Sequence, residues 1–137
     1  VFPMKRAAGL ALVLVGVGNL GRALANYGGF REQGFRVVGI FDDDPNKVGT
    51  HLGEHRVEPL AALPAAVHDR GARIGVIATP AEGAQPVAEM LSAAGVAAIL
   101  NFSPAVVRVP EHVAVRRVDF SAELQGRAFH LHQRATD

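Results

Sequence analysis

Cysteine is absent from this 137-residue sequence, which excludes disulfide bonds, thiolate metal sites and a cysteine nucleophile. No apolar run is long enough to cross a membrane, so we expect no membrane partner. The formal net charge is only +1, which provides no strong basic field for non-specific DNA binding. Because a chain without cysteine fits a reducing compartment, we expect the protein to be cytoplasmic.

Metal-binding and catalytic patterns are missing as well. The six histidines are scattered, and they form no cluster with the spacing of metal ligands. His130 and His132 lie two residues apart on an expected helix, so their side chains do not share a face. No Ser-His-Asp arrangement stands out either. We therefore predict neither a bound metal nor catalytic residues.

Apolar residues make up 49% of the chain, which is enough to form the core of one domain. Their periodicity predicts strands at residues 10–15, 36–41, 74–78, 96–100 and 113–118, and helices at 20–27, 60–71, 84–94 and 121–133. We expect Gly28-Gly29 to end the first helix, and a short helix capped by Asp44 to run from Pro45 to Gly49. The alternation predicts an α/β fold, namely a Rossmann-like, doubly wound, mostly parallel sheet with helices on both faces.

The first nine residues do not match this pattern. Val1 is not an initiator methionine, and the segment lacks the apolar core of a signal peptide. We expect residues 1–9 to be a disordered or residual linker and residues 10–137 to form one domain. The chain is therefore expected to be a piece of a longer protein.

A glycine-rich turn, Gly16-Val17-Gly18-Asn19-Leu20-Gly21, follows the first strand and opens the first helix. This G-x-G-x-x-G context is typical of dinucleotide binding. The first glycine permits a tight turn, the second lets a pyrophosphate approach the backbone, and the third lets helix and strand pack closely. Free N–H groups at the helix start, including those of Asn19 and Leu20, would face the phosphates.

Asp42 ends the second strand about 20 residues beyond the last glycine, where a ribose-binding acid is expected. Its carboxylate could accept hydrogen bonds from both adenosine ribose hydroxyls and would repel a 2′-phosphate. This pattern favours NAD(H) over NADP(H) as the cofactor. A solvated turn is the alternative, and it is the preferred interpretation for Asp43, while Asp44 is expected to cap a helix.

Two further segments lie at the carboxyl ends of predicted strands, the edge at which ligands bind in open α/β sheets. They are Thr79-Pro80 and Asn101-Phe102-Ser103-Pro104. Pro80 could form a wall of the cofactor site, and Asn101 or Ser103 could donate a hydrogen bond to the cofactor. The alternative for both segments is a plain exit from strand to loop.

Four segments of the chain are together similar to the cofactor domain of the bacterial redox-sensing repressor family Rex. They are residues 16–27 (GVGNLGRALANY), 41–49 (FDDDPNKVG), 99–104 (ILNFSP) and 118–120 (VDF). The resemblance implies a homodimeric repressor that senses the NADH/NAD⁺ ratio and releases operator DNA when NADH binds. It also implies a C-terminal helix exchanged between subunits, and an N-terminal winged-helix domain, absent from this chain, through which alone DNA is bound.

The resemblance implies roles for two aromatic residues and one acid. Tyr27 would lie near the nicotinamide, and the partner's Phe120 would pack against the same ring. Either residue could instead be ordinary core. An apolar pocket would favour neutral NADH over cationic NAD⁺, because burying an uncompensated charge is costly. Asp119 would switch partners between the two states, or would cap the last helix.

Two other functions stay open from the sequence. A small NAD-dependent oxidoreductase domain would share the glycine turn, although little chain remains after the sheet for a substrate domain. A CoA-binding domain of the succinyl-CoA synthetase type would share the nucleotide fold but would not need Asp42 on a ribose diol. Because fold alone cannot choose among these functions, the site must do so.

Overall fold

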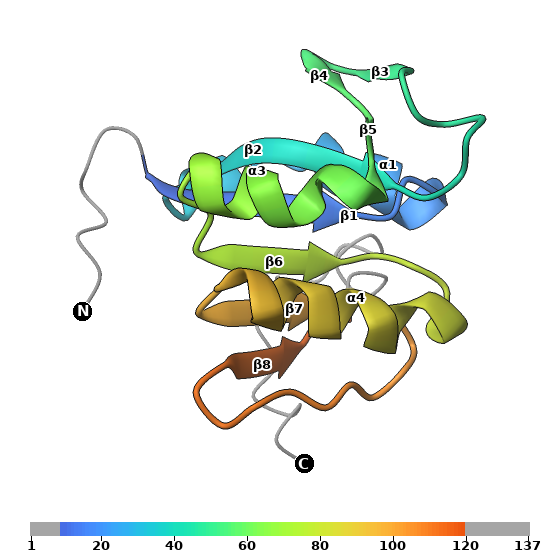
Figure 1. Ribbon diagram of the computed structural model, residues 1–137. Coiled ribbons are helices and arrows are strands. Elements are labelled where there is room, and N and C mark those ends of the chain that lie inside the picture. The colour runs from blue at the N-terminus through green and yellow to red at the C-terminus, as the bar shows by residue number, and fades with distance from the viewer. Residues whose placement is uncertain (1–8, 120–137) are drawn as a thin grey trace.

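The computed structural model describes residues 9–119 (Figure 1). Outside this range lie residues 1–8 of the linker expected at 1–9, the C-terminal helix expected at 121–133, and Phe120. The elements follow one another as β1 (Leu10–Val15), α1 (Asn19–Ala25), α2 (Gly29–Glu32), β2 (Phe35–Asp42), β3 (His51–Leu52), β4 (His55–Arg56), β5 (Glu58–Pro59), a 3₁₀ helix η1 (Leu60–Ala62), α3 (Leu63–Asp69), β6 (Ile74–Ile77), α4 (Ala81–Ala94), β7 (Ala98–Asn101) and β8 (Ala114–Arg117).

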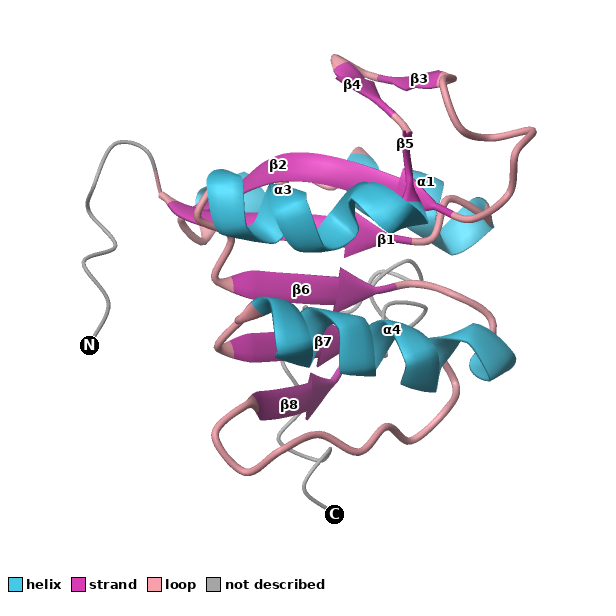
Figure 2. Ribbon diagram, viewed as in Figure 1, coloured by secondary structure: helices cyan, strands magenta, loops and turns pink. Residues whose placement is uncertain are grey.

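Six strands form one sheet in the order β5-β2-β1-β6-β7-β8, and every neighbouring pair is parallel. Strands β3 and β4 pair separately as a small antiparallel hairpin that projects beyond β2 (Figure 2). The chain adds β2 and β5 on one side of β1 and β6 to β8 on the other. The order therefore reverses between β1 and β6, which creates the crevice in which doubly wound sheets bind ligands.

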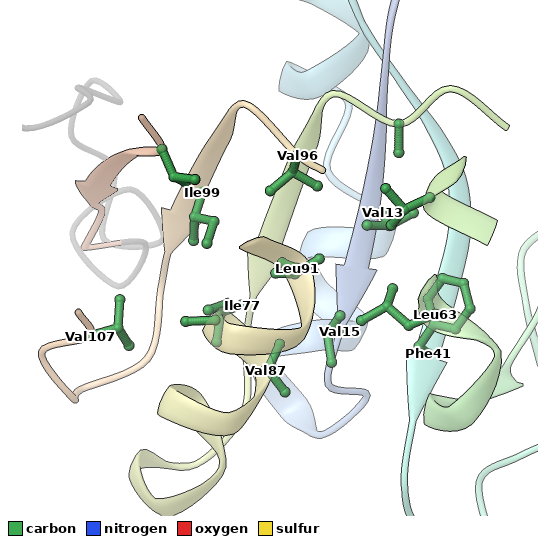
Figure 3. Close-up of a cluster of buried hydrophobic side chains, with 14 of the residues drawn as sticks. Val13, Val15, Phe41, Leu63, Ile77, Val87, Leu91, Val96, Ile99 and Val107 are labelled. Carbon is green, nitrogen blue, oxygen red and sulfur yellow. The ribbon is translucent and has the colours of Figure 1, made fainter. Parts of the chain in front are cut away.

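Both faces of the sheet are covered by helices, as the sequence predicts. Alternate residues of β1 point to opposite faces, so Val13 and Val15 join one core cluster while Leu12 and Leu14 join the other. Helices α3 and α4 cover the first face through side chains such as Leu63 and Leu91 (Figure 3). Helices α1 and α2 cover the second face through Leu24 and Phe30. The α/β, Rossmann-like fold class is confirmed.

The helix expected from Pro45 to Gly49 is wrong, because these residues form a hydrogen-bonded turn. Asp44 does cap the turn: its Oδ1 accepts from the Asn46 N–H at 2.9 Å, and its carbonyl accepts from the Lys47 N–H at 2.8 Å. Gly49 then takes a φ of +92° and donates to the Val57 carbonyl at 2.8 Å. The chain turns toward the β3–β4 hairpin before a helix can propagate.

Gly28-Gly29 does not end the first helix. Helix α1 stops earlier, at the C-cap Asn26, and Gly29 is the first residue of α2. An added Cβ on Gly29 would collide with the ring of Tyr27, so the glycine makes room for that aromatic side chain. Other differences are shifts of a few residues at element ends, such as α4 beginning at Ala81 rather than residue 84.

A bidentate ion pair joins the end of α3 to the outer strand β5. The Arg70 guanidinium donates to the two carboxylate oxygens of Glu58 at 2.7 and 2.8 Å, and also to the Val38 carbonyl at 2.9 Å. The hydrogen bonds to Glu58, with the charge of that carboxylate, raise the pKa of Arg70 above its ordinary value. The pair ties the edge of the sheet to its covering helix.

Residues 9–119 contain neither a helix that could span a membrane nor a cluster of possible metal ligands. No helix within this range is long and apolar enough to cross a membrane. No group of three or more His, Cys, Asp or Glu side chains within the same range could hold a metal ion.

Candidate functional site

A groove of about 780 Å³ lies at the carboxyl ends of β1, β2 and β6, where the strand order reverses. Its walls come from segments that are far apart in the sequence. They are the glycine turn with the end of β1 (Val15–Leu20), the end of β2 (Asp42–Asp44), the exit of β6 (Ala78–Pro80) and the first turns of α4, together with Lys47 and Leu60. The fold thus brings half of the predicted cofactor residues into one crevice, namely Gly16, Gly18, Asn19, Leu20, Asp42, Thr79 and Pro80.

Two glycines of the turn are required by the protein itself. Gly16 has a φ of +109°, and an added Cβ would lie 2.6 Å from the Ala78 carbonyl oxygen of the neighbouring strand exit. An added Cβ on Gly21 would collide with the carbonyl oxygen of Gly16. Gly21 is buried behind the groove and does not line it. These two residues let α1 start close against the end of β1.

Gly18 differs from the other two glycines of the motif. Its φ of −81° is open to any residue, and an added Cβ would meet no atom within 4 Å. Gly18 lines the groove together with Asn19 and Leu20. No side chain caps the start of α1. A Cβ at Gly18 would therefore occupy space that a pyrophosphate could fill, so the residues fit a dinucleotide.

Asp42 stands at the groove end of β2 with its carboxylate fixed in place. Oδ2 accepts from the backbone N–H of Val17 at 2.7 Å, and Oδ1 accepts from the N–H of Asp44 at 2.8 Å. The side chain is half-buried and lines the groove beside the glycine turn. Each carboxylate oxygen can accept a second hydrogen bond, so both ribose hydroxyls could be bound. The turn and the acid predicted to act together are in direct contact.

Thr79 and Pro80 lie on the wall of the groove opposite Asp42, as their sequence position predicts. The Thr79 hydroxyl donates to the Pro80 carbonyl at 2.9 Å, and Pro80 is the N-cap of α4. An added Cβ on Gly83 would contact the Thr79 side chain at 3.4 Å, so this corner is closely packed. The pair shapes the wall of the groove next to the start of α4.

The Asn101-Phe102-Ser103-Pro104 segment does not line this groove. Asn101 and Ser103 are only 1% and 3% exposed, and their polar groups find partners within the loop. Asn101 Oδ1 accepts from the Ser103 hydroxyl at 2.6 Å and from the Ser103 N–H at 3.0 Å, while its Nδ2 donates to the Ala105 carbonyl at 2.7 Å. The polar side chains close the loop after β7, and hydrogen bonding of a cofactor by them stays a prediction.

Tyr27 also lies away from the groove. Its half-buried ring packs edge-on against Phe30, with ring centroids 5.4 Å apart and an interplanar angle of 82°. Both rings border a second hollow, between the α1–α2 segment and the β3–β4 hairpin. The structure therefore does not bring Tyr27 to the other predicted cofactor residues, and its contact with a nicotinamide stays a prediction.

Several groove residues were missed from the sequence. Among them are Lys47, Leu60, Glu82 and Pro86. Lys47 could have been found, because it follows Asp42 within one turn and carries a charge suited to phosphate. Leu60, Glu82 and Pro86 carry no such signal, since only the packing of η1 and α4 beside the glycine turn brings them to the groove.

The sequence matches a known family of nucleotide-binding domains. The family model of the CoA binding domain matches residues 10–105. The chain therefore belongs to the CoA-binding domain family, and its fold is Rossmann-like.

Within this class the chain is homologous to the redox-sensing transcriptional repressor Rex. It is 50% identical to Rex of Streptomyces coelicolor over 139 residues, an alignment that covers 98% of this chain and 54% of that repressor. The chain thus spans slightly more than half the length of this relative. The resemblance seen in the four sequence segments is confirmed.

Solved structures agree with this assignment. RSP, described as a Rex-family repressor, has been solved in complex with β-NADH; it is 33% identical to this chain, with a TM-score of 0.78. The match covers 85% of this chain and 56% of that chain. A second structure holds RSP with β-NAD⁺ and operator DNA, again at 33% identity and a TM-score of 0.78, covering 85% of this chain and 54% of that one. These relatives are named as repressors and not as enzymes.

Proposed function

We propose that this chain is the NAD(H)-sensing domain of a redox-responsive transcriptional repressor, and that the groove at the β1–β6 crossover binds the cofactor. The observation that carries the proposal is the contact between Asp42 and the Val17 N–H, at 2.7 Å, beside the open space at Gly18. In this arrangement Asp42 could accept hydrogen bonds from a ribose while a phosphate approaches the open backbone at Gly18. The homology to Rex and the NADH complex of RSP support the same ligand.

We expect NADH to bind more tightly than NAD⁺. The nicotinamide ring is neutral in NADH and cationic in NAD⁺, so a dry, apolar pocket penalises only the oxidised form. A difference of about 1.4 kcal/mol corresponds to a tenfold preference. We propose that Tyr27 and the partner's Phe120 contribute to this pocket, as the resemblance implies. Phe102 and Pro104 would contribute to cofactor binding through the shape of their apolar side chains. Binding of NADH would then release DNA.

Dimerisation belongs to the same proposal. The resemblance implies a homodimer with exchanged C-terminal helices, and operator contacts made by a winged-helix domain rather than by this Rossmann domain. We propose that the domain has no catalytic residues, and a repressor that meets its operator would act in the cytoplasm. Light scattering at micromolar concentration tests the dimer, since a monomer mass would contradict the exchange.

A CoA-binding domain is the second candidate, because the matching family model carries that description. CoA and NADH share an adenosine diphosphate moiety, but CoA carries a 3′-phosphate where Asp42 would repel it. Calorimetric titration with NADH, NAD⁺, NADPH and CoA separates the functions. We expect the affinity to fall in the order NADH, NAD⁺, NADPH. Equal affinity for both oxidation states would count against sensing, and a preference for CoA would replace NAD(H) with CoA.

A further inference from the structure

Negatively charged side chains outnumber positively charged ones along the groove. Four carboxylates border it, those of Asp42, Asp43, Asp44 and Glu82, and within residues 9–119 Lys47 is the one cation among the lining residues. A dinucleotide brings a doubly negative pyrophosphate into this field. The carboxylates repel the pyrophosphate at short range and so oppose its binding. The single ammonium of Lys47 attracts it, and its position therefore influences where a phosphate can bind.

The backbone of Lys47 is held firmly by the turn that follows β2. Its N–H donates to the Asp44 carbonyl at 2.8 Å. Its own carbonyl accepts from the Thr50 hydroxyl at 2.7 Å and from the Thr50 N–H at 3.1 Å. The turn therefore fixes where the lysine side chain departs, so less conformational entropy remains to be lost when a ligand is bound.

The ammonium of Lys47 reaches the glycine turn. Nζ donates to the Val17 carbonyl at 3.3 Å, while the N–H of Val17 donates to Asp42 at 2.7 Å. Lys47 and Asp42 thus bind the carbonyl and the N–H of Val17, the residue that immediately precedes Gly18. In the described part of the chain Lys47 forms no ion pair. An ammonium has three N–H donors, so two remain for a ligand beside the Val17 contact.

We propose that Lys47 binds the phosphate on the adenosine side of the cofactor's pyrophosphate. This inference rests on the proposed function and deepens it. The ammonium contacts the carbonyl of Val17, the residue whose N–H binds Asp42 and which immediately precedes Gly18. A dinucleotide whose ribose meets Asp42 and whose pyrophosphate meets Gly18 would bring its 5′-phosphate past this residue. Because NADH and NAD⁺ share this phosphate, Lys47 supports both oxidation states equally and does not set the redox preference.

A purely structural role for Lys47 makes a different prediction. If the ammonium only tied the turn to Val17, its loss would loosen Asp42 as well and would weaken every ligand that contains adenosine. If it binds phosphate, its loss weakens only ligands that carry the 5′-phosphate. Adenosine and ADP-ribose therefore distinguish the two roles.

The test is calorimetric titration of the wild-type chain, Lys47→Met and Lys47→Arg with NADH, NAD⁺, ADP-ribose and adenosine. Arg73→Met is the matched control, because Arg73 is exposed and precedes β6 at the opposite edge of the sheet. We expect Lys47→Met to weaken the three phosphate-containing ligands by about tenfold, as for a lost charge-assisted hydrogen bond. Adenosine binding should be unchanged, the NADH to NAD⁺ ratio should be unchanged, and Lys47→Arg should retain most of the affinity.

Three outcomes would overturn the inference. NADH binding by Lys47→Met that equals the wild-type affinity removes Lys47 from the site while the proposed function stands. Equal losses for adenosine and ADP-ribose make Lys47 a structural tether. A wild-type chain that binds none of these ligands contradicts both the inference and the proposed function. A preference for CoA in the titration described under the proposed function, with an intact Lys47 effect here, contradicts only the proposed function.

Discussion

Two polar regions lie at the carboxyl ends of strands of the same sheet, and one is open to a groove while the other is closed and buried. At the ends of β1 and β2, the glycine turn and Asp42 border an open groove. At the end of β7, Asn101 and Ser103 are buried and hydrogen-bond to each other and to their own loop. Both segments satisfy the rule that ligands bind at the carboxyl edge of a parallel sheet.

The difference shows that position at this edge is not enough to identify a ligand-binding residue. A buried polar group must find a partner, and the Asn101 side chain finds its partners, Ser103 and Ala105, within four residues. Asp42 also has partners, but it keeps acceptor positions on a half-buried carboxylate beside empty space. The open end is therefore suited to binding, and the closed end to holding the loop that leads to β8.

Substitutions in the closed loop after β7 should cause the largest loss in the free energy of unfolding. Asn101→Ala removes the acceptor of the Ser103 hydroxyl and the donor to the Ala105 carbonyl inside the core. We expect the free energy of unfolding to fall by about 2–4 kcal/mol, measured by urea denaturation. Ser103→Ala, which removes one hydroxyl, should cost less. The comparison breaks if Asn101→Ala keeps its stability and loses only NADH binding.

The second and third glycines of the motif, Gly18 and Gly21, provide a matched pair of substitutions. Gly21→Ala forces a Cβ against the Gly16 carbonyl and should lower the free energy of unfolding by about 1–3 kcal/mol. Gly18→Ala adds the same methyl group to open space and should change it by less than about 0.5 kcal/mol.

NADH affinity should distinguish the two variants in the opposite order, with the larger effect at Gly18. Gly18→Ala should weaken NADH by at least about tenfold, because the methyl group enters the space assigned to the pyrophosphate. Thermal unfolding and NADH titration of both variants give the two readouts. If Gly18→Ala binds NADH like the wild-type chain, the open space is not the phosphate site.

Asp42→Ala sharpens the assignment of the open end. In the proposed complex the ribose hydroxyls would lose their acceptor, so we expect NADH affinity to fall by about tenfold in a calorimetric titration. Some stability should be lost too, since the Val17 and Asp44 N–H groups lose the same carboxylate. Asp43→Ala is the control with the same change in charge, and it should weaken NADH much less. Equal effects of the two variants would leave only a general charge effect.

The smallest effect is expected far from both ends. Arg70→Met removes an ion pair whose side chains are 38% and 26% exposed, so solvent screens much of the interaction. We expect a loss of about 0.5–1 kcal/mol in the free energy of unfolding and no change in NADH affinity. A change in affinity comparable to that of Asp42→Ala would mean that stability alone controls binding.

The fold could be predicted from the sequence because its signals are local. Apolar runs such as residues 10–15 and 74–77 mark strands buried on both faces, and Gly95 ends α4 in a left-handed conformation. The Pro45–Gly49 segment was mispredicted, because an Asp cap followed by proline also starts a tight turn. Only the tertiary pairing of Gly49 with Val57 separates the two outcomes.

The site was predictable only where residue type and position agree. Gly16, Gly18 and Asp42 each have a spacing that implies their role, and all three line the groove. Asn101 and Ser103 have the right position, but the sequence does not reveal that they satisfy each other. Lys47 and Glu82 reach the groove through a turn and a helix start whose placement depends on the packing of the whole sheet.

Amide hydrogen exchange with and without NADH tests the central claim most directly, because unliganded N–H groups at a helix start exchange readily. We expect NADH to protect strongly the amides from Gly18 to Gly21, together with those next to Asp42. We expect no such change at the already buried Ser103. Protection confined to the hollow beside Tyr27 and Phe30, with none at the glycine turn, would contradict the account.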